Sequence, residues 1–377
     1  MLSSGSSITR VEAWATSFPL AVPLQFGDLR VDRRHFVVTQ LTTRDGVQGV
    51  AYGLSRGAPV DLVVTDLLGP LLLQQDALNI PGILERCRKA MVPLGLSGLV
   101  QRGLSLVDIA LWDIKARVAH LPLWRLLGGF QQQVPVMLVD GYIGQDETDG
   151  TFADRLAVRA QQGFTAIKLA NQADPDTMVG RLSAVRQAVG PSVALVLDVV
   201  WAWRDVRRAI EVARRWAPAR LAWIEDPFPC DFVAQTRRLR ASIETPIGAG
   251  DELSTPSTFD ALIADQALDI VRLDATTIGG ITGFAQVHGR AAAAGHKVSP
   301  HIYPEIHQHC AFAWPGIEPV EMFPAGGAFD FSHKFVTAGA LEFEGPGRLR
   351  APGRDGIGME MDWDAISRNL SRHSVAG

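Results

Sequence analysis

Residues 193–228 read VALVLDVVWAWRDVRRAIEVARRWAPARLAWIEDPF, two short apolar runs separated by a segment of helix length. The first run ends at Asp198 and the second at Glu225. A short apolar run bounded by turns is typical of a buried strand, and the amphipathic segment between the runs indicates a crossover helix. The stretch therefore predicts one unit of a parallel α/β sheet with an acidic residue at each strand end.

The same rhythm continues after residue 133. The apolar runs are VPVMLVD, FTAIKLA, VALVLDV, LAWIEDP, TPIGAGD, LDIVRLD, HKVSPH and PVEMF. Eight such runs separated by helices are the pattern of a closed (β/α)8 TIM barrel. An open doubly wound sheet is the competing reading, but no GxGxxG motif follows the first strand. We therefore predict an α/β barrel over residues 131–345.

The segments that flank the barrel follow other patterns. Residues 1–130 begin with alternating apolar runs around Asp45-Gly46 and continue with helical spacing that stops at Gly128-Gly129, which predicts an α+β domain. Residues 346–377 contain many glycines and prolines and no barrel period. We expect this C-terminal segment to pack back on the N-terminal domain.

The composition excludes several classes of partner. The 377 residues carry 36 basic and 40 acidic side chains, a net charge of -4, without a block of like charge, so neither nucleic acid nor anionic lipid is an expected partner. No run of about 18 apolar residues predicts a membrane span. Three cysteines without a CxxC pair argue against a disulfide framework. We expect a cytoplasmic protein.

The polar residues at the strand ends carry the predicted chemistry, because active sites of such barrels lie at the carboxyl ends of the strands. In order they are Lys168, Asp198, Glu225, Asp251, Asp274, His301 and Glu321. Asp198, Glu225 and Asp251 end consecutive strands and should converge, and a divalent cation relieves the repulsion among three carboxylates. Mg²⁺ is favoured because no His or Cys ends these strands. The alternative is that each carboxylate caps the following helix.

Five motifs in order resemble the enolase superfamily in its mandelate racemase branch. They are ALWDIKARVAHLPLWRLLGG, WIEDP, PIGAGDE, LDATTIGGITGF and SPHIYPEIHQH, and the resemblance covers nearly the whole chain. It implies an enolase-like modified barrel with an N-terminal capping domain, which the C-terminal segment completes. It also implies one Mg²⁺ per subunit, held by Asp198, Glu225 and Asp251. Relatives are commonly dimers or octamers, so the resemblance implies a homo-oligomer.

The resemblance assigns roles to the remaining strand-end residues. Asp274 and His301 match a dyad in which the carboxylate orients the imidazole and raises its basicity. Glu321 matches an acid that hydrogen-bonds the substrate carboxylate opposite the metal. The implied first step is removal of the proton α to a carboxylate, giving an enediolate. His307 and His309 belong to the helix after His301 and are expected to be structural or solvent-facing, and Glu305 is expected to be an acid of its first turn, favourable to the helix dipole.

The chain departs from this family at the second barrel strand. The branch places a K-x-K pair there, but GFTAIKLAN has Lys168 at the first position and Ala170 at the second. A racemase needs acid–base groups on both faces of its planar intermediate, so the missing lysine disfavours inversion. Val200 stands where relatives often have asparagine. Trp201 and Trp203 make this side of the barrel more apolar; either core packing or substrate stacking explains them.

These observations predict a lyase, a Mg²⁺-dependent dehydratase that converts an acid sugar, a small hydroxy-carboxylate, into a 2-keto-3-deoxy acid. The catalytic set is His301, Asp274, Glu321 and Lys168. Racemisation, epimerisation and lactone cycloisomerisation remain alternatives, because they share the first step. Remote alternatives are a Schiff-base aldolase that uses Lys168 and a barrel that only binds. Substrate specificity is expected from capping-domain loops around residues 17–30 and 53–59.

Overall fold

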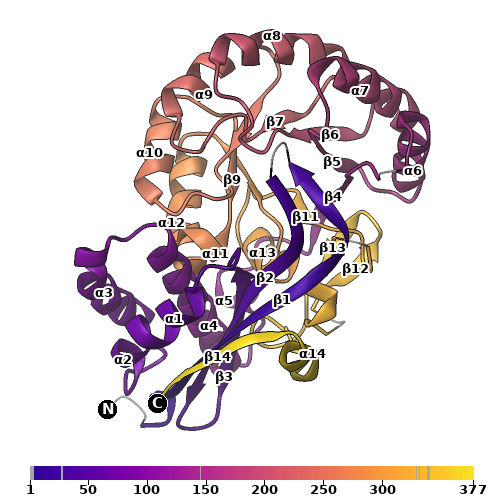
Figure 1. The fold of residues 1–377 in the computed structure, drawn as a ribbon. Coiled ribbons are helices and arrows are strands. Elements are labelled where there is room, and N and C mark those ends of the chain that lie inside the picture. Colours follow the sequence, from indigo (N-terminus) through magenta and orange to yellow (C-terminus); the bar gives the residue numbers. More distant parts are fainter. Residues whose placement is uncertain (1–3, 27–28, 145, 328, 331, 338–339) are drawn as a thin grey trace.

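The structure, a computed structural model, describes residues 4–377 except 27–28, 145, 328, 331 and 338–339. Figure 1 shows an antiparallel sheet with its helices at the bottom and a ring of parallel strands and helices above it. The C-terminus lies beside the lower end of this sheet. No helix within these residues is long and apolar enough to cross a membrane.

The lower domain is an antiparallel sheet covered by helices. Its strands, in the order β14-β1-β2-β3, are β1 (Ile8–Phe26), β2 (Leu29–Thr43), β3 (Gln48–Leu54) and β14 (Leu370–Ala376). Its helices are α1 (Val60–Leu62), the π-helix η2 (Val63–Leu68), α2 (Gly69–Leu72), α3 (Ile80–Met91), α4 (Leu99–Val118) and α5 (Leu123–Leu126). Short 3-10 turns precede β1 (Ser4–Ser6) and follow α3 (Val92–Leu94). The apolar face of α4 packs into the same core as β2 and β3.

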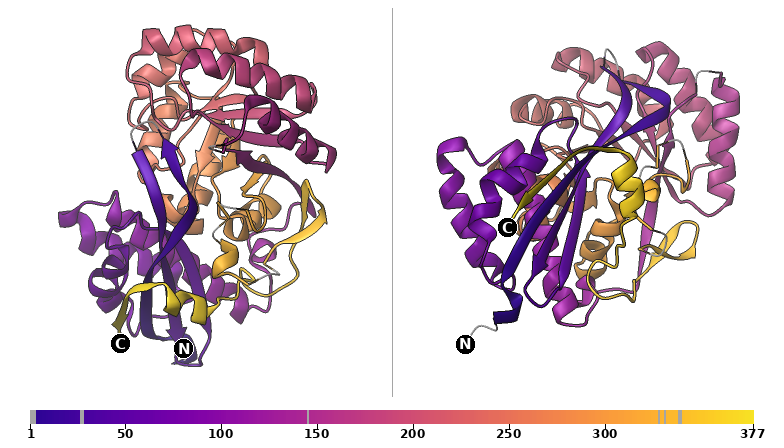
Figure 2. Two further views of the ribbon diagram at one scale, coloured as in Figure 1. Left: turned by 45° about the vertical axis from the view of Figure 1, so that its right-hand side comes forward. Right: turned by 60° about the horizontal axis from the view of Figure 1, so that its bottom comes forward.

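The expected loop around residues 17–30 is mostly strand. β1 and β2 form a long hairpin that rises beside the barrel, as both views of Figure 2 show. Pairing along the hairpin shifts register between Pro19 and Leu24, where prolines interrupt the ladder of hydrogen bonds. Residues 27–28 of that expected loop lie outside the described residues. The specificity role expected for this region stays a prediction.

The eight apolar runs form the strands of the barrel, as predicted. They are β4 (Gln133–Gly141), β5 (Ala166–Ala170), β6 (Ala194–Asp198), β7 (Trp223–Glu225), β8 (Ile247–Ala249), β9 (Ile270–Leu273), β10 (Lys297–Pro300) and β11 (Val320–Met322). Neighbours from β4 to β10 pair in parallel and in chain order, and β11 pairs with β4. A bridge between Val298 and Ile317 brings the chain before β11 beside β10, which closes the ring.

Helices surround the ring after each strand from β4 to β10. They are α6 (Asp149–Gln161), α7 (Pro175–Val189), α8 (Val206–Trp216) with the 3-10 turn η4 (Ala217–Ala219), α9 (Val233–Arg240), α10 (Pro256–Ala264), α11 (Ala275–Ile278), α12 (Gly280–Ala293) and α13 (Pro304–Ala313). The chain after β11 forms a 3-10 turn, η5 (Ser332–Lys334), in place of a long helix, and the hairpin of β12 (Glu342–Gly345) and β13 (Arg348–Arg350) follows. The barrel is therefore of the modified kind.

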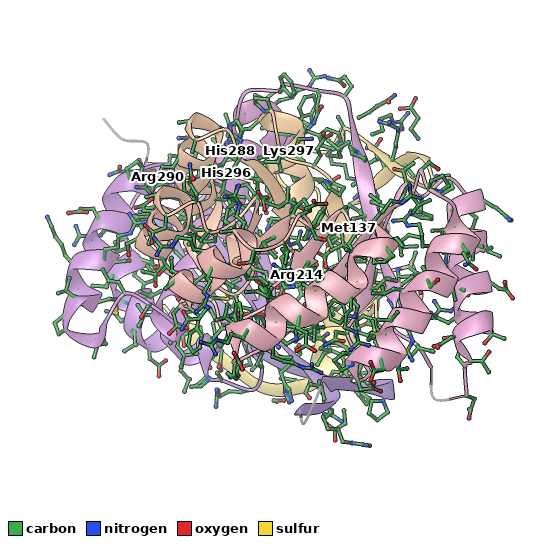
Figure 3. All side chains as sticks on the ribbon, turned by 90° about the horizontal axis from the view of Figure 1, so that it is seen from above. Met137, Arg214, His288, Arg290, His296 and Lys297 are labelled. Carbon is green, nitrogen blue, oxygen red and sulfur yellow. The ribbon has the colours of Figure 1, made fainter. Side chains whose placement is uncertain are left out.

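Apolar side chains fill the barrel interior below the strand ends. Met137, Ala166, Val196 and Trp223, from four successive strands, form one buried cluster. Such a layer is a packed core, so the polar space lies only at the carboxyl ends of the strands. Figure 3 places His288, His296 and Lys297 together over α12 and the start of β10. His301 follows the other end of this strand, so His288 and His296 lie away from the predicted site.

The C-terminal segment is tied to the lower domain. β14 pairs antiparallel with β1, and the side chain of Asp113 on α4 holds two further segments. Asp113 accepts hydrogen bonds from the backbone N–H groups of Val50 (3.0 Å) and Ile357 (2.8 Å). It also forms an ion pair with Arg117 (3.0 Å). A Cβ on Gly356, whose φ is +70°, would lie 2.1 Å from Asp113 Oδ1, so this turn needs glycine.

Replacing Asp113 with alanine should strongly destabilise the protein. The substitution leaves two buried N–H groups and a guanidinium without their acceptor, which costs about 2–4 kcal/mol of unfolding free energy. Chemical denaturation measures the loss. Asp265→Ala, at a half-exposed carboxylate, is the control and should change the free energy by less than about 0.5 kcal/mol. Equal stability of the two variants would show that Asp113 does not join the segments.

Candidate active site

The ammonium of Lys168 joins three of the predicted strand-end carboxylates. Its Nζ lies 3.1 Å from Asp198 Oδ2, 2.6 Å from Glu225 Oε1 and 3.2 Å from Glu321 Oε1. Lys168, Glu225 and Glu321 are buried, while the Asp198 side chain is 14% exposed. Strands β5, β6, β7 and β11 therefore bring their polar ends to one point, as the barrel geometry predicts.

Arg272 is a second buried cation in this cluster, and sequence reasoning missed it. Its Nε lies 3.1 Å from Glu225 Oε2, and its guanidinium also pairs with Glu321. Nη1 donates to the backbone oxygens of Ser299 (2.9 Å) and Pro300 (3.1 Å). The sequence held a signal: Arg272 is two residues before Asp274, so both fall on the inward face of the strand.

Burial and charge act against each other in this cluster. Burial opposes the charged form of Lys168, but Asp198 and Glu225 outweigh it and raise the pKa of the ammonium. Burial also opposes ionisation of Glu225, yet Arg272 and Lys168 lower the pKa of that carboxyl. For Asp198, burial outweighs Lys168 and raises the pKa. The positive charges of Lys168 and Arg272 therefore do not fully offset the burial and the negative charge of the carboxyl groups around them.

Asp251 lies beside an acid that was not predicted, Asp226. Asp251 Oδ1 and Asp226 Oδ2 are buried, and neither accepts a hydrogen bond from the described residues. Burial raises the pKa of Asp251 to about 6, and burial together with Asp251 raises the pKa of Asp226 well above its usual range. The backbone N–H of Gly250 donates to the other oxygen of Asp226, Oδ1, at 3.0 Å.

The donor set fits a hard divalent cation, with one difference from the predicted ligands. Among the described residues, the three groups whose ligand atoms all lie within 4.8 Å of one another are Asp226, Cys230 and Asp251. Burial raises the pKa of the Cys230 thiol, and a neutral thiol is no ligand for Mg²⁺. The partnerless oxygen of Asp251 and the excess of carboxylates suit Mg²⁺. The assignment to Asp198, Glu225 and Asp251 stays a prediction.

Asp274 and His301 form the contact expected of a dyad. His301 Nδ1 lies 3.1 Å from Asp274 Oδ2, and His301 Nε2 lies 3.5 Å from Asp251 Oδ2. Asp274 is the one strand-end carboxylate of the predicted set that caps a helix, because its Oδ1 accepts from the N–H of Thr276 at 2.7 Å. Asp274 thus has one oxygen for the helix and one for the imidazole.

The surroundings of His301 and Asp274 shift the pKa of both side chains, while the rise in the basicity of His301 implied by the resemblance stays a prediction. Burial first, and then Lys168 and Arg272, lower the pKa of His301 well below its usual range. Burial also raises the pKa of Asp274 well above its usual range. Both effects favour neutral forms, because a charged group loses hydration in the closed site. His301 is therefore a neutral imidazole, the form that can accept a proton.

The other polar residues of the helix after His301 are structural. Every residue of α13 is buried, so the solvent-facing option for His307 and His309 is excluded. Each imidazole accepts one backbone N–H and contacts one carbonyl oxygen. Glu305 lies in the first turn of α13, as predicted, and it is buried: it accepts from Tyr52 Oη at 2.7 Å, and burial raises its pKa.

Of the residues that follow Asp198, two have a strained backbone and one packs in the core. Val200 and Trp201 have φ values of 52° and 53°, in the left-handed region that β-branched and bulky residues rarely adopt. Such strain is common beside functional sites. Trp203 packs against Trp216 and Phe228, with ring centroids 5.5 and 6.3 Å apart, so core packing explains it.

A cavity lies between the lower domain and the barrel mouth. Its volume is about 310 Å³, and residues that follow His301 and Glu321 line it together with residues of β2 and β3. Arg34, Tyr52, Ile302, Met322, Phe323 and Phe329 are among its walls. Two arginines of the lower domain, Arg56 and Arg102, form ion pairs with Glu252 next to the predicted ligand Asp251. The lower domain therefore helps to enclose the site.

Known proteins share this arrangement. Residues 8–128 match the mandelate racemase/muconate lactonizing enzyme N-terminal domain, and residues 151–365 match the enolase C-terminal domain-like family. L-talarate/galactarate dehydratase of Salmonella typhimurium is 30% identical over 84% of this chain and 81% of its own length. The 3,6-anhydro-alpha-L-galactonate cycloisomerase of Streptomyces coelicolor is 32% identical over 88% and 90%. The crystal structure of L-talarate dehydratase from Polaromonas sp. JS666, complexed with Mg and L-glucarate, has a TM-score of 0.88, 26% identity and coverage of 98% and 99%.

Mg²⁺ titration of Asp198→Asn tests whether Asp198 is a ligand, with Cys230→Ser as the control. If Asp198 is a ligand, its amide variant should lose at least the roughly 10- to 100-fold in affinity that removal of an outer-sphere partner causes. Cys230→Ser should bind Mg²⁺ as the wild type does. Calorimetry measures both. Normal Mg²⁺ binding by Asp198→Asn would contradict the assignment of Asp198 as a ligand.

Proposed function

The chain belongs to the mandelate racemase/muconate lactonizing enzyme family of the enolase superfamily, and we propose that it is a Mg²⁺-dependent acid-sugar dehydratase. The observation that carries the proposal is the His301–Asp274 dyad at the barrel mouth, with no protic side chain at position 170 of β5. Relatives that dehydrate talarate, galactarate and arabinonate support the reaction class. The substrate is a small polyhydroxy carboxylate.

His301 carries the proton in this proposal. Its neutral imidazole takes the α proton, the electrons of the C–H bond form a double bond to the carboxylate carbon, and the electrons of its C=O double bond move onto oxygen, which gives the enediolate. The protonated imidazole then gives the proton to the β-hydroxyl, which leaves as water while the α–β double bond forms. The resulting enol tautomerises to a 2-keto-3-deoxy acid. One group can serve both steps because the proton it removes is the proton that the leaving hydroxyl needs.

The substrate carboxylate needs positive charge and hydrogen-bond donors. Mg²⁺, held by Asp198, Glu225 and Asp251, would stabilise the negative charge that develops on this carboxylate. Lys168 is the second source: its ammonium stays protonated between its carboxylate partners and can donate from the interior of the barrel. Glu321 lies between Lys168 and Arg272, which hold it in place for the opposite side of the carboxylate.

The side chain at position 170 determines whether a second base lies on the face of the substrate opposite His301. Ala166, Lys168 and Ala170 alternate along β5 with Ile167 and Leu169, and Ala166 belongs to the interior cluster. Ala170 therefore also points into the barrel, at the level of the site. A methyl group cannot move a proton. Removal from one face suffices for dehydration, whereas racemisation requires return on the other face.

The alternatives are less well supported by these contacts. A Schiff-base lysine must be a neutral amine, but three carboxylates surround Lys168 and its pKa is raised. A barrel that only binds does not explain an intact dyad. Cycloisomerisation shares the first step, and a cycloisomerase is among the relatives, so it is the second candidate. The products distinguish it: a keto acid forms only in dehydration.

Assembly and location remain predictions from the sequence. We infer a homo-oligomer, a dimer or octamer, because the family resemblance implies one. A cytoplasmic location agrees with the three cysteines being free, two of them buried. Neither nucleic acid nor a membrane is an expected partner.

His301→Asn should abolish exchange of the α proton and leave Mg²⁺ binding unchanged. Loss of a general base costs about 10²- to 10⁴-fold in rate. A panel of acid sugars with Mg²⁺ in D₂O, followed by NMR and by keto-acid assay, measures exchange and dehydration separately. His296→Asn, at the other end of the strand, is the control and should behave as the wild type. Deuterium uptake by the wild type without keto acid would count against dehydration.

Ala170→Lys should add a base on the opposite face. Wild type is expected to exchange the α proton of only one of two C2 epimers, and the lysine variant should begin to exchange the other. Ala170→Met is the matched control, because it adds similar length without an amine. The measurement is deuterium uptake into each epimer. Exchange of both epimers by the wild type would show that a second base already exists.

A further inference from the structure

His307 lies directly behind the dyad and contacts both of its strand ends. Its Nε2 accepts the backbone N–H of Ala275 at 2.9 Å, and Ala275 follows Asp274. Its Nδ1 lies 2.6 Å from the carbonyl oxygen of Ile302, which follows His301. One buried imidazole therefore links the peptide after the dyad acid to the peptide after the dyad base.

These contacts determine the tautomer of His307. A nitrogen that accepts an N–H carries no proton, so the single proton of the neutral ring is on Nδ1 and is donated to Ile302. Asp274 Oδ1 lies 3.7 Å from Nε2, beyond hydrogen-bond distance, and faces a lone pair. Burial lowers the pKa of His307 to about 4, so the ring does not become a cation that would compete with His301 for Asp274.

The turn that His307 holds is strained. Ile302 and Tyr303 have φ values of 34° and 47°, although neither is glycine and Ile302 is β-branched. Such conformations cost of order 1–3 kcal/mol each and persist only where surrounding contacts fix them. Two contacts fix this turn: His307 Nδ1 bonds the Ile302 carbonyl oxygen, and the Tyr303 hydroxyl accepts the N–H of Leu54 at 2.7 Å.

We propose that His307 is a positioning residue of the proton-transfer site: its neutral imidazole fixes the strained turn after His301 against the peptide after Asp274, and so sets the geometry of the dyad. The inference rests on the proposed function of the dyad. His307 touches no reacting atom. A displacement of about 1 Å in a catalytic group can cost about 100-fold in rate. Loss of the His307 contacts should therefore lower kcat while the contacts to substrate and metal stay the same.

The chain offers a closely matched control on the same helix. His309 is also fully buried, and burial also lowers its pKa to about 4. Its Nδ1 accepts the N–H of Trp124 at 3.1 Å, and its Nε2 lies 2.9 Å from the carbonyl oxygen of Ile357. These partners belong to α5 and the C-terminal segment. His309 therefore has the same kind of contacts as His307, but none with the dyad strands.

The experiment compares His307→Leu and His307→Gln with His309→Leu and His309→Gln in Mg²⁺-loaded enzyme. His307→Leu should lower kcat for α-proton exchange by about 10- to 100-fold, with KM and the Kd for Mg²⁺ nearly unchanged. His307→Gln, which can both accept and donate, should recover much of the rate. The two His309 variants should lower the melting temperature but leave kcat near that of the wild type.

Three results would overturn the inference: a kcat loss in His307→Leu no larger than in His309→Leu, no recovery by glutamine, or a change confined to KM. If His307→Leu does not fold, the two glutamine variants carry the same comparison. If the wild type exchanges no α proton on any substrate, the proposed function fails. The positioning role of His307 is then tested by amide hydrogen exchange of Ala275. This exchange should be faster in His307→Leu than in His309→Leu, and equal protection in the two variants would overturn the inference.

Discussion

Charge confined inside the barrel is the constraint on which the rest of this structure depends. Lys168 and Arg272 lie among carboxylates that arrive from three other strand ends, and nearly all of these groups are buried. Buried ions of one sign repel strongly and lose hydration, so the cluster holds only if each charge has partners. The closed ring of strands supplies those partners at fixed positions, and the lower domain covers them.

Two different electrostatic environments meet in this small space. On the side of β5, β7 and β11, Lys168 forms an ion pair with Glu225, and Arg272 forms an ion pair with Glu321. On the side of β8, Asp251 retains an oxygen without a donor among the described residues. The predicted Mg²⁺ ligands come from both sides, because Glu225 belongs to the first and Asp251 to the second. His301 Nε2 lies 3.5 Å from Asp251 Oδ2 on the second side.

Much of this arrangement follows from the sequence, since apolar runs predict strands and the residue ending each run lies at the mouth. Asp198, Glu225, Asp274 and His301 were found that way. Arg272 was missed because it is inside a run, where a charged residue reads as an interruption. Asp226 was missed because it follows a predicted ligand directly. The end of the long hairpin, around residues 17–30, was read as a loop because Pro19 and its neighbours do not resemble a strand; pairing with β2 overrides that local preference.

The roles of neighbouring histidines could not be separated by spacing alone. His301, His307 and His309 lie within nine residues, yet one faces the site, one supports it and one joins the barrel to the C-terminal segment.

The central claim is that His301 is the single proton carrier. A crystal structure with Mg²⁺ and a bound, unreactive acid-sugar analogue tests it most directly. The account predicts His301 Nε2 within about 3.5 Å of the α carbon on one face and no protic side chain within reach of the other. A lysine, tyrosine or carboxyl group within hydrogen-bond distance of that opposite face would contradict it.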